Sequence, residues 1–174
     1  MRFERLTDTA DEMYPKAMEL YGVSFPFHEQ REGDSQAGIM GHKEYQFNLI
    51  YDGDEFAGLM LCWETARFIY VEHFCILPAL RNRRYGQRVL ELLKERGKPI
   101  ILEIDPPVDE VSVRRKGFYK RLGFRSNGCR HCHPAYHRGY AGHDLVVMSC
   151  PEPLSKEEYN EFNRYLKAVV MEGT

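Results

Sequence analysis

Three apolar segments separated by short connections constrain the fold of this chain more than any other feature of its sequence. They cover residues 45–51, 56–63 and 68–77, and the first connection is an Asp-Gly-Asp turn in which glycine can adopt a positive φ. Segments of this length that follow each other so closely pair as an antiparallel meander. Pro78 then ends the third segment, because proline cannot donate a hydrogen bond to a sheet. An antiparallel sheet therefore forms the centre of the predicted fold.

Helical and strand patterns alternate around this meander. Four further strands are predicted at residues 3–6, 100–104, 124–128 and 144–149. Helical spacing of apolar residues predicts helices at residues 10–21, 85–93, 109–122 and about 155–170, and the segment 24–41 is predicted to be a loop with one short helix. This order predicts an α+β (mixed α/β) fold, with a mostly antiparallel central sheet of about seven strands flanked by helices.

No repeat, low-complexity tract or Pro/Gly/Ser-rich linker divides the chain. We therefore interpret residues 1–174 as a single domain, with a core at about residues 1–150 and an additional C-terminal helix. That helix opens with a capping box formed by Ser155 and Glu158. Its apolar face is predicted to pack on the domain itself, and a homodimer in which it packs on a second copy is the alternative.

Composition and charge exclude several classes of protein. Lys and Arg number 24 against 26 for Asp and Glu, so the chain lacks the basic character of a nucleic-acid-binding protein. No apolar run approaches the ~20 residues that span a bilayer, and charged residues stand near the N-terminus where a signal peptide needs apolar ones. The five cysteines are odd in number and scattered, which favours free thiols in a reducing compartment. We predict a cytoplasmic protein with no membrane or nucleic-acid partner.

Residues 71–88 contain the segment that indicates a ligand-binding site. A strand runs into a basic turn, and the turn opens a helix whose first N–H groups have no helical partners. Arg81, Arg83 and Arg84 lie within four positions, and Gly86 lets a ligand approach the backbone. Together these features predict a pyrophosphate site at the N-terminus of the helix, with a solvated basic helix start as the alternative.

This segment resembles the cofactor loop of the GNAT superfamily of acyl-CoA-dependent N-acetyltransferases. In that family an Arg or Gln, two residues, Gly, one residue, and then Gly or Ala follow a strand and a proline. Arg81 and Gly86 match the first and last positions, whereas Arg84 replaces the middle glycine. A second block, from Ser112 to the sequence F-Y-K-R-L-G-F, is similar to the late helix of the family, with Ser112 in place of Asn and Arg115 in place of a small residue. The two blocks, with the strands between them, imply a GNAT fold.

The resemblance implies a site for acetyl-CoA. In the family, the strand before the cofactor loop bulges and splays from the next strand, and the pantetheine arm pairs with its exposed backbone. In this chain the backbone of residues 74–76 would contact pantetheine, and residues 82–87 would surround the pyrophosphate. The predicted cofactor-binding residues are Phe74, Cys75, Ile76, Arg81, Asn82, Arg83, Arg84, Tyr85, Gly86, Gln87, Ser112 and Tyr119.

Direct acyl transfer needs a neutral amine, a donor to the thioester oxygen and an acid for the departing thiolate. The resemblance places Glu72 as the base, acting through water and on the same strand face as Phe74 and Ile76, with His73 as the alternative base. The backbone N–H of Ile76 is the predicted donor. Tyr119 is the predicted acid, because a phenol with a pKa near ~10 stays protonated at neutral pH. The structural alternatives are a salt-bridged carboxylate for Glu72 and a core tyrosine for Tyr119.

A Cys- and His-rich loop at residues 129–143 separates the last two predicted strands. Its C-x-x-C pair offers zinc-ligand types, but it lacks a second C-x-x-C and any H-x3–5-H pair beyond His133 and His137, so we predict no metal site. In the family the loop at this position lines the acceptor pocket. The predicted acceptor residues are Phe27, Arg31, His73, His131, Tyr136 and His137.

These features predict an N-acetyltransferase that transfers an acetyl group from acetyl-CoA to the primary amine of a small molecule. A catalytically weak acyl-CoA-binding sensor on the same fold is the alternative, suggested by the departures at Arg84, Ser112 and Arg115. A zinc-dependent interaction module built on residues 129–143 is a third hypothesis.

Overall fold

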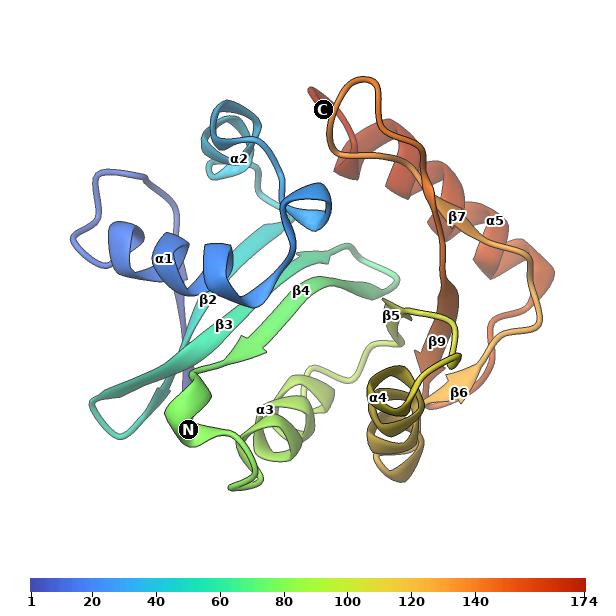
Figure 1. Cartoon of the computed structure of the whole chain (residues 1–174), viewed down its shortest axis with the longest axis horizontal. Coiled ribbons are helices and arrows are strands. Elements are labelled where there is room, and N and C mark those ends of the chain that lie inside the picture. The colour runs from blue at the N-terminus through green and yellow to red at the C-terminus, as the bar shows by residue number, and fades with distance from the viewer.

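The computed structural model describes residues 1–174 and has a seven-stranded sheet at its centre (Figure 1). The strand order is β1-β2-β3-β4-β5-β9-β6, and every neighbouring pair is antiparallel except β4 and β5. The strands are β1 (Arg2–Leu6), β2 (Tyr45–Asp52), β3 (Glu55–Glu64), β4 (Ile69–Ile76), β5 (Ile100–Ile104), β6 (Arg125–Ser126) and β9 (Val146–Cys150). The predicted mostly antiparallel sheet of about seven strands is confirmed.

Helices cover both faces of this sheet. They are α1 (Tyr14–Ser24), α2 (Gly33–Ile39), α3 (Tyr85–Lys94), α4 (Glu110–Arg121) and α5 (Lys156–Tyr165), with short helical turns η1 (Phe27–Glu29), η2 (Pro78–Leu80) and η3 (Leu166–Val170). Helices α1, α2 and α5 lie on one side of the sheet, and α3 and α4 lie on the other (Figure 1). A separate ribbon pairs β7 (Cys132–His133) with β8 (His143–Asp144). None of these helices has both the length and the apolar content to cross a bilayer.

Each face of the sheet has its own apolar core. On the α1 side, Trp63 and Tyr70 are buried together with Phe162 of α5. On the α3 side, Met60 of β3 packs with Val89 of α3. Since the central strands are covered on both faces, their sequences are nearly continuous apolar runs instead of alternating ones.

The C-terminal helix begins as its sequence predicts. The Ser155 hydroxyl accepts from the backbone N–H of Glu158, and the Glu158 carboxylate accepts from the backbone N–H of Ser155. Its apolar face, together with Leu166 and Val170 of η3, is buried in the α1-side core of the same chain.

Strand β4 contains a bulge where it passes β3. The adjacent β3 residues Leu61 and Cys62 pair with His73 and Val71, so Glu72 is an extra residue with no partner in β3. A bulge of one residue shifts the alternation of side chains along the strand.

The bulge decides which side chains share a face. Glu72 contacts residues of the α1-side core, and His73 packs against Tyr21 of α1, so both lie on that side. Phe74 and Ile76 pack in the α3-side core. The prediction that Glu72 shares a face with Phe74 and Ile76 is therefore wrong, because it assumed a regular strand.

Strands β4 and β5 pair only over their first three residues. The last pair is Val71 with Leu102, and beyond it β4 turns away from β5 (Figure 1). Glu72 on one arm and Glu103 on the other are the first residues beyond the paired part. We call this opening the fork.

Candidate active site

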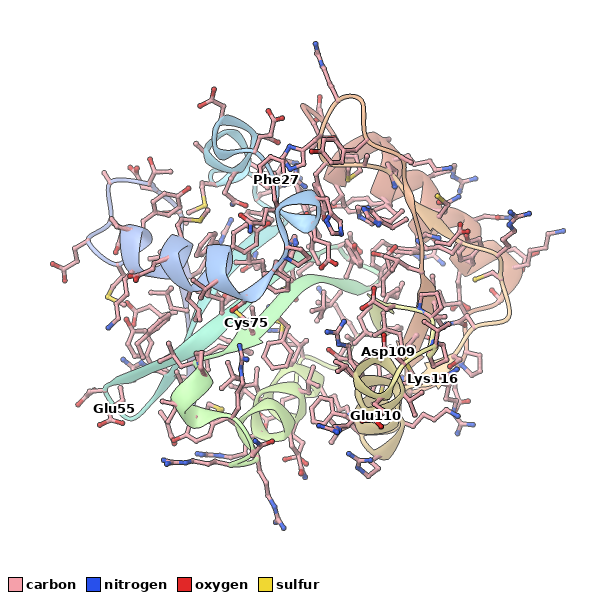
Figure 2. All side chains as sticks on the ribbon, in the orientation of Figure 1. Phe27, Glu55, Cys75, Asp109, Glu110 and Lys116 are labelled. Carbon is pink, nitrogen blue, oxygen red and sulfur yellow. The ribbon has the colours of Figure 1, made fainter.

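A cavity of about 630 Å³ lies at the fork. Its wall includes Phe74 and Tyr119 from the α3 side of the sheet, and His73 and Tyr136 from the α1 side. Figure 2 shows Cys75, which also lines the cavity, between α1 and α3. The cavity therefore connects the two faces of the sheet at the point where β4 and β5 separate.

The backbone of β4 presents unpaired amides to the fork. The Leu77 N–H donates to the Ala57 carbonyl of β3 at 2.9 Å. Because successive amides of a strand point to opposite sides, the Cys75 N–H faces β3 as well, and the amides of Phe74 and Ile76 face the fork. An extended amide-containing chain can pair with those two amides as an added strand.

A second cavity, of about 460 Å³, lies next to the first, at the turn before α3. Both cavities are lined by Ile76, Arg81 and Gly86. The predicted loop residues that line the second cavity are Arg81, Asn82, Arg84, Tyr85, Gly86 and Gln87; Arg83 lines neither. Unpaired N–H groups of the first turn of α3, the positive end of its dipole and the arginines suit a pyrophosphate.

Two residues of this turn have a left-handed backbone. Asn82 and Arg84 both have φ of 62°. Asparagine tolerates this region, but a residue such as arginine is destabilised in it by about 1–2 kcal/mol. Arg84 thus has the left-handed backbone conformation that glycine adopts easily, and glycine is the residue that the family motif has at this position. Arg84 differs from the motif only in its side chain.

Glycine at position 84 should relieve this strain. We expect Arg84→Gly to be more stable than Arg84→Ala by about 1 kcal/mol, because both variants lack the charge but only glycine adopts a positive φ freely. Urea unfolding of the two variants measures the difference directly. Equal free energies of unfolding would contradict the left-handed conformation.

Tyr119 extends from α4 into the cavity wall. Its hydroxyl forms no hydrogen bond within the chain, and burial raises its pKa to about 12. The phenol is therefore protonated at neutral pH and available to a ligand in the cavity.

Ser112 has a different role from the one predicted. It caps α4: its backbone N–H donates to Asp109 Oδ1 at 2.8 Å, and its hydroxyl accepts from the Asp109 N–H at 3.1 Å. Figure 2 shows Asp109 at the start of α4. Ser112 is buried and lines neither cavity, and the cap uses its hydroxyl, so the geometry favours a structural role for Ser112 over contact with the cofactor.

The Glu72 carboxylate is bonded by three side chains. Arg31 Nη2 lies 2.9 Å from Oε1, the Tyr136 hydroxyl donates to the same oxygen at 2.9 Å, and Trp63 Nε1 donates to Oε2 at 2.8 Å. The side chain is 1% exposed, and burial alone would raise its pKa. The Arg31 charge and the donors outweigh burial and lower the pKa to about 2. A carboxylate with so low a pKa is a weak proton acceptor. The geometry therefore favours a role for Glu72 in anchoring its neighbours over the predicted role as a base.

His73 lines the cavity as a neutral imidazole. Its Nε2–H donates to the Glu29 carbonyl at 2.8 Å, and its ring packs edge-on against Tyr21 and Phe25. Burial lowers the pKa of this ring. Nδ1 makes no hydrogen bond within the chain, so it is a free acceptor.

Glu103 was not singled out by the sequence analysis, although it lines the cavity opposite the arm that carries Glu72. Its carboxylate accepts from the Tyr70 hydroxyl and is bonded to His131 Nε2. Burial opposes its ionisation, but these bonds lower its pKa. The sequence did contain a signal for this residue, because Glu103 is a single charge within the apolar run I-I-L-E-I. Burying a charge is unfavourable unless the charge is paired and hydrogen-bonded, so such a residue is expected to have a specific partner.

The structure separates the predicted acceptor residues into three pairs. His73 and Tyr136 line the cavity, whereas Arg31 and His131 are buried behind the carboxylates of the fork. Phe27 and His137 lie apart from the cavity, where their rings stack at 4.2 Å and Phe27 is 62% exposed (Figure 2).

The Cys- and His-rich loop does not gather its side chains around one point. Cys132 is exposed, whereas His131 is buried against Glu103, and His143 stacks on His28 at 4.9 Å. No three His, Cys, Asp or Glu side chains come together in a group that could hold a metal ion.

Comparison with known proteins identifies the family. The profile of the acetyltransferase (GNAT) domain matches residues 43–126, which include β4, the turn before α3 and Tyr119. A solved GNAT-family structure from Bacteroides thetaiotaomicron, described as a candidate acetyltransferase, is 33% identical, with all of both chains covered and a TM-score of 0.92. The chain belongs to the GNAT acetyltransferase family.

Two further comparisons agree with this GNAT assignment. YjbC of Bacillus subtilis (strain 168), named as a candidate acetyltransferase, is 29% identical over 105 residues. That match spans 58% of this chain and about half of YjbC, 52%. An aminoglycoside 6'-N-acetyltransferase solved with coenzyme A has 15% identity and a TM-score of 0.60, with 90% of this chain and 100% of that chain covered. At this identity the second comparison shows the fold alone.

Proposed function

We propose that this GNAT acyltransferase moves the acetyl group of acetyl-CoA to the primary amine of a small molecule by direct attack in a ternary complex. The observation that carries the proposal is a pair of neighbouring cavities with shared lining residues, one at the basic turn before α3 and the other at the fork, where it reaches the α1 side. A cofactor can enter from one face and an acceptor from the other.

Each part of acetyl-CoA has a matching part of the cavity. The turn before α3 would hold the pyrophosphate, and the amides of Phe74 and Ile76 would pair with pantetheine. The presence of coenzyme A in the structurally similar aminoglycoside enzyme supports this assignment. No metal takes part in the proposal.

The chemistry then follows from the side chains at the fork. The amine nitrogen attacks the thioester carbonyl carbon, and the Ile76 N–H donates to the oxygen as it gains negative charge. The carbon–sulfur bond breaks, and the Tyr119 hydroxyl donates its proton to the departing thiolate, which leaves as the thiol of coenzyme A. The nitrogen carries one extra proton after attack and returns it through water to the Tyr119 oxygen, so that the products are the amide and the thiol. Glu72 holds Arg31, Trp63 and Tyr136 together beneath the bulge and thereby positions β4.

The charged residues that line the cavity favour a cationic acceptor. Glu29, Glu103 and Asp105 line the cavity against Arg81 and Arg115, and Arg115 is itself paired with Asp105 at 2.6 Å. An amine that arrives as an ammonium ion is therefore attracted to this pocket. The five unpaired cysteines support a reducing, cytoplasmic location.

The test is amine-dependent release of coenzyme A. The purified protein is mixed with acetyl-CoA and each member of a panel of amines, amino acids and amino sugars, and both products are measured by mass spectrometry. We expect at least one amine to gain an acetyl group in step with coenzyme A release. Saturable acetyl-CoA binding without transfer to any amine would instead identify an acyl-CoA sensor.

A further inference from the structure

We propose that Arg121 of α4 binds the 3′-phosphate of acetyl-CoA, and that the protein thereby selects the complete cofactor over its 3′-dephospho form. The inference rests on the proposed function, which supplies the cofactor. Acetyl-CoA has two separate anionic groups, which are the pyrophosphate and, on the ribose, a phosphate monoester with a charge of about −1.5 to −2 at neutral pH. The turn before α3 accounts for the first of these groups only.

The two cavities differ in the charges that line them. Four acidic side chains line the cavity at the fork, namely Glu29, Glu72, Glu103 and Asp105. Three arginines and no acidic residue line the second cavity, and these arginines are Arg81, Arg84 and Arg121. A pocket lined by cations alone attracts a ligand with several negative charges. The second cavity is therefore suited to the phosphorylated end of the cofactor.

Arg121 reaches the second cavity from a different element than the other two arginines. It is the last residue of α4, and Phe118 and Leu122 lie beside it in the cavity wall. Helices α3 and α4 lie on the same side of the sheet (Figure 1). Of the five cations of α4, only Arg121 lines this cavity. A ligand that is held by the turn before α3 can therefore meet a further cation on α4.

The arginines of the turn are placed for the pyrophosphate. Arg84 directly precedes Tyr85, the first residue of α3. Arg81 Nε donates to the Ile76 carbonyl at 3.2 Å, which holds this side chain at the boundary between the two cavities. Both arginines thus lie at the end of α3 where unpaired N–H groups favour an anion. Arg121 is the cation that remains for the second phosphate.

The Arg121 guanidinium has no partner within the chain. It forms no ion pair and donates no hydrogen bond, whereas Arg115 of the same helix is paired with Asp105 at 2.6 Å. A Cβ at position 117 would lie 3.4 Å from Arg121 Nη1, so the side chain runs back along α4 over Gly117. An unpaired guanidinium can donate two parallel hydrogen bonds to phosphate oxygens. This group therefore has the chemistry that a 3′-phosphate requires.

Calorimetric titration with coenzyme A and with 3′-dephospho-coenzyme A tests the assignment. The two probes differ only in the 3′-phosphate, and both are measured at one ionic strength of about 0.15 M, because salt screens exposed charges. The variant is Arg121→Gln, since glutamine and arginine have similar helix propensities. Lys120→Gln is the matched control, because it removes the same charge from the next position of α4 and Lys120 lines neither cavity.

We expect the native protein and Lys120→Gln to bind coenzyme A on the order of 30-fold more tightly than the 3′-dephospho form. In Arg121→Gln this preference should fall below about 3-fold, while affinity for the 3′-dephospho form stays within about 3-fold of the native value. Arg84→Gly should weaken both probes by the same factor, because both contain the pyrophosphate.

Three results would overturn the assignment. The native protein could bind both probes equally, the preference could survive in Arg121→Gln, or Lys120→Gln could lose the preference to the same extent. The last result would show that the overall charge of α4 matters and not the position of Arg121.

A local measurement places the phosphate at Arg121. The Nε–H signal of Arg121 is identified in NMR spectra by its absence from the Arg121→Gln protein. At saturation this signal should move much further with coenzyme A than with the 3′-dephospho form. Equal movement with both probes would contradict the proposed contact.

These results are independent of amine acetylation. Selective binding of coenzyme A without acetylation of any amine would support the Arg121 site and show that the proposed function is wrong. Acetylation of an amine by a protein that binds both probes equally would support the proposed function and overturn the Arg121 site. Failure to bind either probe would overturn both.

Discussion

Replacing Tyr119 by phenylalanine is expected to lower turnover on the order of 100-fold while leaving acetyl-CoA affinity within about 2-fold. The hydroxyl has no partner in the chain and lies in the cavity wall, so its removal leaves the packing of the ring unchanged. Only the departing thiolate, which exists late in the reaction, loses a donor. The effect should therefore appear in kcat and not in binding.

Steady-state kinetics and calorimetry on the same preparation measure the two quantities. Tyr140→Phe is the control, because Tyr140 is 55% exposed and lies outside the cavity. An unchanged kcat in Tyr119→Phe would remove Tyr119 from the mechanism and leave solvent as the proton source.

The second large effect is expected on stability, at the buried pair of Arg31 and Glu72. Arg31→Met should lower the free energy of unfolding at pH 7 by about 3–5 kcal/mol, since it leaves a buried carboxylate without its counter-charge. It also removes the 2.6 Å bond from Arg31 to the Val170 carbonyl, which ties the C-terminal helical segment to the floor of the site. Urea unfolding measures the loss.

The stabilisation by the Arg31–Glu72 pair is expected to depend on pH in a defined direction. The pKa of Glu72 is about 2 in the folded protein against an ordinary value of 4.5, so the folded state favours the ionised form. The stabilisation is present above about pH 4.5 and is lost as the pH falls toward 2. In Arg31→Met the buried carboxyl is favoured in its neutral form, so the deficit relative to the native protein should shrink on acidification.

Arg67→Met provides the comparison for this pair. Arg67 pairs with Glu161 at 3.2 Å on the surface, where its side chain is 68% exposed. Its loss should change stability by less than about 1 kcal/mol. A comparable loss for both variants would show that the buried position of Arg31 is not what matters.

The sequence predicted the features that depend on local patterns. The meander, the Ser155 cap and the helix after the basic turn are each specified by neighbouring residues, and the structure contains them. The cofactor-loop motif and the late-helix block implied a GNAT fold, and the resemblance to that family implied that the strand before the loop separates from the next strand.

The features that were missed depend on contacts between distant residues. The resemblance implied a bulge in this strand, but its position at Glu72 has no signal in the strand sequence, and that position decides which face carries the carboxylate. Glu103 is a single charge in an apolar run, but its partner His131, 28 residues later, is known only from the folded chain. Ser112 fitted the family position, but its hydroxyl is used by the local cap.

The central claim is that the fork and the turn before α3 hold acetyl-CoA, and calorimetric titration of the native protein tests it most directly. We predict saturable binding of one acetyl-CoA per chain, weakened at least about 10-fold in Gly86→Val. In that variant a side chain must fit where a Cβ would already lie 3.3 Å from the Phe118 ring, between the two cavities. Absence of binding at millimolar ligand, or equal binding by both proteins, would contradict the account.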